Sequence, residues 1–272
     1  MKFLIILLSL LIIINFIKVE GTIHNQNNTA RPNIHLNESN FVAIRGVIDF
    51  QSEAQFINDI LSIKGKTIYI HINSPGGSVT SGNNMIQVME SLIQNGKQII
   101  CIADFAASMG FVLFQSCPTR YVMDHSIIMQ HQMSLGVEGP IEQVRTLFNL
   151  IEKFNKKAQK MQALRLNMGT TEFQDKIKHD WWLYSEEIIE ENAADAMVNV
   201  LCDFNTDKSY NITKQVLFWE VNIEFSLCPL IRKPRKISIN VEEININKKL
   251  IELVDNNFKE NPYSFDKEFK VY

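Results

Sequence analysis

The middle of the chain alternates between strand-like and helix-like hydrophobic patterns, and this alternation restricts the possible folds more than any other feature. The segment TIYIHIN (67–73) places isoleucine at every second position, which is the period of a strand. From Met85 to Ile93 the apolar residues return at helical spacing, and QIICIA (98–103) is a second apolar strand pattern. Strands that alternate with helices predict a mostly parallel α/β sheet.

Flanking segments extend this pattern. NFVAIRGVID (40–49) predicts a strand, SEAQFINDILSIKG (52–65) a helix, and RYVM and SIIMQH two short strands that end at residue 131. Between about 139 and 165 one apolar stripe repeats at helical spacing over about seven turns. Such a long helix predicts an arm that joins subunits, and packing within the chain is the alternative.

The strand pattern at 98–103 leads into ADFAASMG, where small residues surround a single serine, Ser108. A serine hydroxyl becomes a useful nucleophile only when a base takes its proton. Alanine and glycine neighbours leave room for the sharp strand-to-helix turn that exposes such a serine, as in a nucleophile elbow. At such a turn the backbone N–H of Met109 lies at a helix start, where it is free to donate.

A second turn, SPGGS, follows the strand at 67–73 and precedes the helical pattern. Gly76 and Gly77 would let the backbone approach a substrate closely, and a glycine N–H there can point into a site. We therefore expect Gly76 to lie where substrate binds. An ordinary strand-to-helix turn is the alternative interpretation.

The chain has six histidines that could serve as the base for the serine. His131 follows an apolar strand, so it would lie at a strand end beside the serine turn, and His179 is its rival. Asp180 is the candidate that would orient the imidazole and stabilise the imidazolium, although by spacing alone it is one acid among several.

Four segments carry a family resemblance: IYIHINSPGGSVTSG, CIADFAASMG, SIIMQHQ and DWWLYSEEIIEENAADAMV. With them, the chain from Phe41 to about Asp203 resembles the proteolytic subunit of the Clp protease, a serine peptidase of the ClpP/crotonase fold. The resemblance implies an α/β fold built as a repeated ββα spiral with a protruding handle helix. It also implies a homo-oligomeric ring that hydrolyses peptides or unfolded proteins.

The resemblance further implies the roles of individual residues. Ser108, His131 and Asp180 would form a catalytic triad that acts through an acyl-enzyme, in the order that the family shows. The amides of Gly77 and Met109 would form the oxyanion hole.

The chain departs from the family pattern in places. The segment after Cys101 is one residue longer, and Met133 stands where the family usually has proline. ADFAAS is also similar to bacterial signal-peptide peptidases, which use a lysine base, so a membrane-associated protease of that type is an alternative. An inactive ClpP/crotonase-like scaffold is another, against which the intact serine, histidine and aspartate argue.

The N-terminus reads MKFLIILLSLLIIINFIKVEGT, the layout of a signal peptide over 1–21, with an uncleaved membrane anchor as the alternative. We expect a flexible leader over 22–39, the peptidase domain over 40–204 and an extension over 205–272 of unknown role. Within that extension QVLFWEVNIEF (215–225) predicts a strand and KKLIELVDNNF a helix.

Other features agree with a secretory-pathway or secreted protein, membrane-anchored if the N-terminal segment stays uncleaved. Asn27, Asn37 and Asn211 begin glycosylation patterns, which would make the protein a glycoprotein. Cys202 and Cys228 could pair in an oxidising compartment, whereas we expect Cys101 to be a plain core residue. The family resemblance implies a AAA+ unfoldase partner, for which a secretory compartment offers no obvious source.

Composition excludes some functions. The formal net charge of −3 gives no broad basic surface, so nucleic acid is not an expected partner. The sequence shows no metal-ligand spacing, phosphate loop or cofactor motif, and it therefore predicts neither a metal nor a cofactor.

Overall fold

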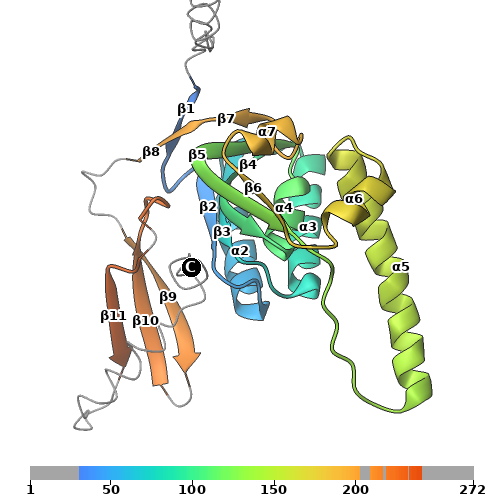
Figure 1. The fold of residues 1–272 in the computed structure, drawn as a ribbon. Coiled ribbons are helices and arrows are strands. Elements are labelled where there is room, and N and C mark those ends of the chain that lie inside the picture. Colours follow the sequence, from blue (N-terminus) through green and yellow to red (C-terminus); the bar gives the residue numbers. More distant parts are fainter. Residues whose placement is uncertain (1–30, 203–208, 217–218, 232, 241–272) are drawn as a thin grey trace, which may run out of the picture. The chain divides into compact units, whose positions relative to one another are not determined.

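The fold comes from a computed structural model of the chain, which describes residues 31–202, 209–216, 219–231 and 233–240 (Figure 1). Contacts divide the chain after residue 32, and the fold below is that of the unit from Asn33 onward. The predicted signal peptide, Asn27 and the helical pattern KKLIELVDNNF lie outside the described residues.

The core is a six-stranded sheet. Its strands are β2 (Phe41–Arg45), β3 (Thr67–Ser74), β4 (Gln98–Ala107), β5 (Thr119–Gln130), β6 (Trp181–Tyr184) and β7 (Ala196–Met197). The first four pair in chain order and run parallel, β6 is antiparallel to β5, and β7 pairs parallel with β5. This arrangement confirms the predicted mostly parallel α/β sheet.

Helices connect the parallel strands. They are α2 (Phe50–Ser62), α3 (Val79–Gln94) and α4 (Met109–Gln115). Asp49 caps α2 in a capping box, because its side chain accepts from the Ser52 N–H at 2.8 Å while the Ser52 hydroxyl accepts from the Asp49 N–H. The isoleucines of β3 at 68, 70 and 72 are fully buried under these helices, each worth about 1.5–3 kcal/mol of transfer free energy.

The two short strands predicted before residue 131 form one strand, β5, whose pairing with β4 is interrupted. Ala103 pairs with Val122, and the next pair is Phe105 with Ile127. Between these pairs the register leaves out one residue of β4, Asp104, and four residues of β5. The Ser126 hydroxyl donates to the Ala103 carbonyl at 2.7 Å and closes this bulge. Against β3, consecutive residues pair with Ala103 and Phe105, and Asp104 alone is left out of the register, so it is the extra residue of β4 on that side.

A long helix, α5 (Ile141–Arg165), follows β5, and α6 (Thr170–Lys176) packs against it. Much of its apolar stripe lies in solvent: Ile141 is 73% exposed, Phe148 53% and Leu164 69%. No described segment of the chain covers these side chains, so the alternative of packing within the chain does not hold for them. None of the described helices is both long enough and apolar enough to cross a bilayer.

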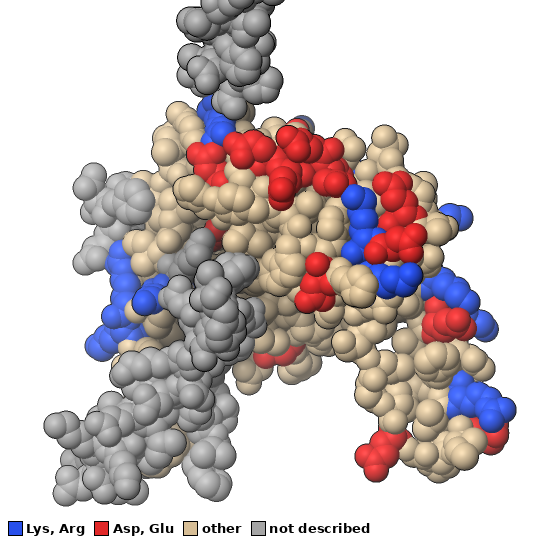
Figure 2. All heavy atoms as spheres, in the orientation of Figure 1, with Lys and Arg blue, Asp and Glu red and all other residues tan. Residues whose placement is uncertain are grey.

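A short helix, α7 (Glu187–Glu190), follows β6. Its exposed glutamates belong to a group of acidic side chains that gathers over α7 and β7 (Figure 2). Basic side chains on this face of the molecule form one group along α5 and a second group on the opposite side of the view (Figure 2).

Part of the expected flexible leader is a strand. β1 (Asn33–Leu36) pairs in parallel with β8 (Asn199–Cys202), and the side chains of Ile34 and Leu36 are buried in a small cluster with Val200. The leader sequence is rich in asparagine, which concealed two alternating apolar residues from pattern analysis.

The described residues beyond 204 contain a separate antiparallel sheet. Its strands are β9 (Ser209–Val216), β10 (Trp219–Ser226) and β11 (Lys236–Asn240), in the order β11-β10-β9. The single strand predicted over 215–225 is wrong, because this segment spans the end of β9 and most of β10. No glycine, proline or asparagine separates Val216 from Trp219, so the sequence carries no turn signal there.

Two disulfides connect these elements. Cys202 pairs with Cys228, as the sequence allowed, and links β8 to the residues after β10. The interpretation of Cys101 as a plain core residue is wrong, since it pairs with Cys117 across a Cα–Cα distance of 6.0 Å. The pairing arises because α4 folds back along β4, which places the end of the helix beside the middle of the strand.

Arg45 of β2 fastens the C-terminal sheet to the six-stranded sheet. Its guanidinium lies 5.7 Å from the ring centroid of Tyr210 and 5.4 Å from that of Phe225. It also donates to the carbonyls of Ser226 at 3.4 Å and Ile231 at 3.0 Å. Burial lowers the pKa of Arg45, but a guanidinium remains charged at physiological pH.

An ion pair joins the start of β5 to the turn before β7. Arg120, 4% exposed, donates to Asp195 at 2.6 Å and to Gln115 at 2.5 Å, while Arg165 of α5 lies 3.6 Å from Asp195. Burial alone would raise the pKa of Asp195. The hydrogen bonds from Arg120 and the charges of both arginines outweigh it, so this pKa lies below its ordinary value.

Replacing Asp195 by asparagine should lower the free energy of unfolding by about 1–3 kcal/mol, because it leaves the buried Arg120 without its carboxylate. A depressed carboxyl pKa stabilises the fold above the unfolded pKa, and this contribution is lost as pH falls through the folded pKa. The difference between wild type and Asp195→Asn should therefore shrink below about pH 4. Urea unfolding at pH 7 and pH 3.5 measures it, and an unchanged difference would contradict the account.

Candidate active site

Ser108 occupies the turn between β4 and α4 in a strained backbone conformation. Its φ of 53° and ψ of −118° are unusual for a residue with a side chain. Its N–H donates to the Met129 carbonyl of β5 at 2.9 Å, which ties the turn to the neighbouring strand. Although Ser108 is the N-cap residue of α4, its side chain makes no capping bond and is left for other contacts.

His131 follows the last residue of β5 and is half-buried. Its Nε2 lies 2.8 Å from the Ser108 Oγ. The contact follows from topology, because β4 and β5 are parallel neighbours whose carboxyl ends meet at one edge of the sheet. In the tautomer that carries its proton on Nδ1, the imidazole accepts from the serine hydroxyl and can act as its base.

The residue before His131 holds the end of β5. The side-chain oxygen of Gln130, 5% exposed, accepts from the His131 N–H at 3.1 Å. The amide of Gln130 in turn donates to Gln162 of α5 at 2.5 Å. Sequence reasoning missed Gln130, although a glutamine at the end of an apolar strand is a signal that could have revealed it.

The glycine turn lies directly against the serine turn. Gly76 has a φ of +96°, and a Cβ on it would lie 2.7 Å from the Ser108 Cβ and 2.8 Å from the Met109 nitrogen. The buried Ser74 hydroxyl accepts from the Gly76 N–H at 3.1 Å and donates to the Gly46 carbonyl at 2.6 Å. A side chain at position 76 is therefore excluded by both backbone conformation and space.

Two backbone amides near the serine are available to an oxygen. Met109 is the first residue of α4, where an N–H has no partner within the helix. Within the described residues, neither the Met109 N–H nor the Gly77 N–H donates a hydrogen bond. A helix N-terminus and free amides together favour negative charge on a bound atom.

Asp180 does not bond to His131 in this structure. The last registered pair of β5 and β6 is Gln130 with Trp181, so His131 and Asp180 are the next residues on facing strands. Within the part of the chain that the structure describes, however, no hydrogen bond or ion pair joins them, and Asp180 is exposed.

The other candidate bases do not reach the serine. His179 is exposed, His71 is buried within β3, and His125 contacts the Tyr184 hydroxyl at 2.9 Å. Among the described side chains, His131 is the hydrogen-bond partner of the Ser108 hydroxyl, and no lysine ammonium bonds to it.

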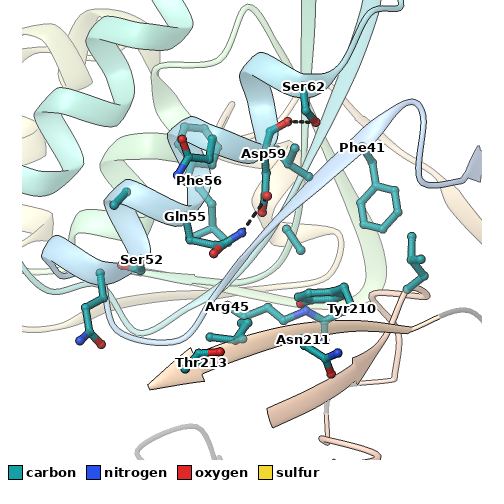
Figure 3. Close-up of a pocket in the computed structure, with 18 of the residues that line it drawn as sticks. Phe41, Arg45, Ser52, Gln55, Phe56, Asp59, Ser62, Tyr210, Asn211 and Thr213 are labelled. Atoms are coloured by element: carbon teal, nitrogen blue, oxygen red, sulfur yellow. Dashed lines mark hydrogen bonds between the residues drawn. The ribbon is translucent and has the colours of Figure 1, made fainter. Parts of the chain in front are cut away.

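A cavity of about 560 Å³ lies elsewhere, between α2, β2 and β9 (Figure 3). Arg45, Asp59 and Tyr210 are among its lining residues, whereas Ser108 and His131 are not. Burial raises the pKa of Asp59 and of Tyr210, so the phenol remains protonated at neutral pH. This cavity belongs to the junction with the C-terminal sheet and not to the serine site.

Comparison with known proteins identifies a family of similar sequences. The sequence model described as Clp protease matches residues 25–200, more than half of the chain. The chain is 30% identical to ATP-dependent Clp protease proteolytic subunit 2 of Bifidobacterium longum over 135 residues, 49% of this chain and 64% of that protein. The same subunit of Thermobifida fusca is 30% identical over 146 residues, 53% of this chain and 71% of that protein. The same subunit of Tropheryma whipplei is 30% identical over 125 residues, which are 45% of this chain and 68% of that protein.

Gly76→Ala should lower the rate at which a fluorophosphonate probe labels Ser108 by at least about 100-fold. The reason is that the new methyl group displaces the Met109 amide and the Ser108 side chain. Gly169→Ala is the matched control, since a Cβ there meets nothing within 4 Å and its φ of −69° suits alanine. Labelling rates and circular dichroism spectra of both folded variants measure the effect. Undiminished labelling of Gly76→Ala would contradict the proposed contact.

Proposed function

The chain belongs to the Clp protease family, and from that premise we propose that it is a serine endopeptidase that hydrolyses peptides or unfolded proteins. The observation that carries the proposal is the 2.8 Å contact between the Ser108 hydroxyl and the His131 imidazole at the end of two parallel strands. The chain spans about two thirds of the length of the relatives that it matches, so activity, substrates and partners are all part of the proposal.

In the proposed reaction His131 Nε2 takes the proton of Ser108 as Oγ attacks the scissile carbonyl carbon. The amides of Gly77 and Met109 donate to the oxyanion of the tetrahedral intermediate. His131 then gives its proton to the leaving amine, which departs and leaves an acyl-enzyme on Ser108. A water molecule, deprotonated by His131, hydrolyses that ester and restores the serine.

Asp180 is proposed to complete the triad by accepting from His131 Nδ1. Support comes from the strand register, which makes the two residues neighbours across β5 and β6. A carboxylate in this position fixes the imidazole tautomer and stabilises the imidazolium. Catalytic hydrogen bonds often tighten only when substrate binds, so closure of Asp180 onto His131 would accompany binding or assembly.

Assembly into a homo-oligomeric ring is proposed from the family and from the uncovered apolar stripe of α5. Exposed stripes of this size usually mark interaction surfaces. The relatives' names describe ATP-dependent proteases. For this chain the proposal is limited to peptide-bond hydrolysis, because the expected secretory compartment offers no obvious AAA+ unfoldase.

Secretion is proposed from the apolar N-terminal sequence and is supported by the two disulfides, which persist in oxidising compartments. Asn37 begins an exposed turn and Asn211 is exposed on β9, so both are accessible acceptors for glycosylation. The alternative with a lysine base is not favoured, since the serine already has a histidine partner.

Peptide hydrolysis and fluorophosphonate labelling test the proposed function. Ser108→Ala should lose both, His131→Ala should lower kcat by about 10³–10⁴-fold, and Asp180→Asn by about 10²–10⁴-fold. His179→Ala is the control for a neighbouring exposed histidine and should stay within about twofold of wild type.

Two outcomes would contradict the proposal. One is folded, assembled wild-type protein that neither hydrolyses peptides nor labels at Ser108, which would favour a scaffold. The other is full activity in His131→Ala, which would favour a lysine base.

A further inference from the structure

The Cys101–Cys117 disulfide encloses the serine turn. Cys101 lies in β4, the strand that precedes Ser108, and Cys117 follows α4, the helix that begins after it. The two sulfurs thus connect the strand and the helix whose junction is the turn. Both side chains are buried, at 0% and 1% exposure, so the bridge is part of the core beneath the site.

The turn needs such a restraint. α4 has only seven residues, and a helix of that length is not stable by itself. The Ser108 side chain does not cap it, because its hydroxyl bonds to His131 instead. The backbone at Ser108 is strained, and a strained residue keeps its conformation only where its surroundings enforce it.

The far end of the bridge is also fixed. The carbonyl of Cys117 accepts from Arg165 Nη2 at 2.9 Å, and the next carbonyl, of Pro118, accepts from it at 3.0 Å. Arg165 is the last residue of α5, so these two bonds attach the segment after α4 to the end of α5. α4 is thus restrained at both ends. The Ser108–Met129 bond holds its start, beside the Met109 amide, and the disulfide and Arg165 hold its end.

We propose that the Cys101–Cys117 disulfide is a positioning element that holds Ser108 and the Met109 amide in reactive geometry, and that it makes hydrolysis depend on an oxidising compartment. The inference rests on the proposed function of Ser108. Cys101 and Cys117 do not touch substrate, and they act through the turn that they enclose.

The redox step is a thiol–disulfide exchange. The two thiols of Cys101 and Cys117 lose two protons and two electrons to a disulfide-bonded oxidant, whose own disulfide is reduced to two thiols. A reducing cytosol opposes this exchange and a secretory lumen favours it. The chain is therefore weakly active before oxidation and fully active afterwards.

A positioning role differs from simple stabilisation in a measurable way. A disulfide that only restricts the unfolded chain raises the melting temperature and leaves kcat unchanged well below it. A disulfide that holds the nucleophile changes kcat and the labelling rate of the folded protein while KM stays the same.

The experiment compares oxidised and reduced forms of one chain, Cys202→Ser/Cys228→Ser, in which Cys101 and Cys117 are the only cysteines. Production with and without a reductant gives the two forms. Intact mass after alkylation in denaturant, with two alkyl groups or none, identifies each. Both are assayed for peptide hydrolysis and fluorophosphonate labelling at a temperature well below either melting point.

We expect kcat and the labelling rate of the reduced form to fall about tenfold, with KM within twofold and activity regained on reoxidation. The Cys202→Ser/Cys228→Ser change by itself should leave the oxidised rate equal to wild type. Equal kcat in the two forms, with only a lower melting temperature after reduction, would overturn the inference.

A second variant covers the case in which the reduced form does not fold. Cys101→Val/Cys117→Ala fills the same space with apolar groups, and it should show the same tenfold loss of kcat. Wild-type kcat in that variant would overturn the inference. If the oxidised form itself neither hydrolyses nor labels at Ser108, the proposed function fails, which is a different result from equal activity of both forms.

Discussion

The parallel pairing of β4 with β5 is the constraint on which the site depends. It makes two strands end at the same edge of the sheet, and the bond from the Ser108 N–H to the Met129 carbonyl fixes how far one end lies from the other. The serine follows one strand and the histidine follows the other. Their 2.8 Å contact therefore needs no long loop. Beyond the irregularity at Asp104 the pairing resumes from Phe105–Ile127 to Ala107–Met129, directly before the serine.

Strain and close packing convert this pairing into a reactive geometry. The serine turn is held in an unusual conformation, and the glycine turn lies so close to it that no side chain fits at Gly76. The helix after the serine begins without a side-chain cap, so its first amide stays free. Gln130 and the Cys101–Cys117 disulfide support the two sides of the site from within the core. The reactive groups themselves are half-exposed, while the groups that hold them are buried.

The described contacts that attach the C-terminal sheet to β2 and β8 involve neither Ser108 nor His131. Arg45 lies against two aromatic rings of this sheet and donates to the carbonyl of Ser226 in β10 and to that of Ile231, which follows β10. A disulfide between Cys202 and Cys228 ties the residues after β10 to β8. The cavity beside Arg45 is a consequence of this junction. The family match ends at residue 200, so this sheet lies outside the matched region.

The sequence by itself determined the alternation of strands and helices between residues 40 and 131, the two small-residue turns, and Ser108 and His131 as candidate partners. These depend on local periodicity and on residue size, which a chain carries in its primary structure. Only the tertiary structure decided which cysteine meets Cys101, that β1 joins β8, that one apolar run becomes two strands, and that Asp180 stands apart from His131. Such outcomes depend on contacts between residues distant in the chain, and no local pattern encodes the distance between them.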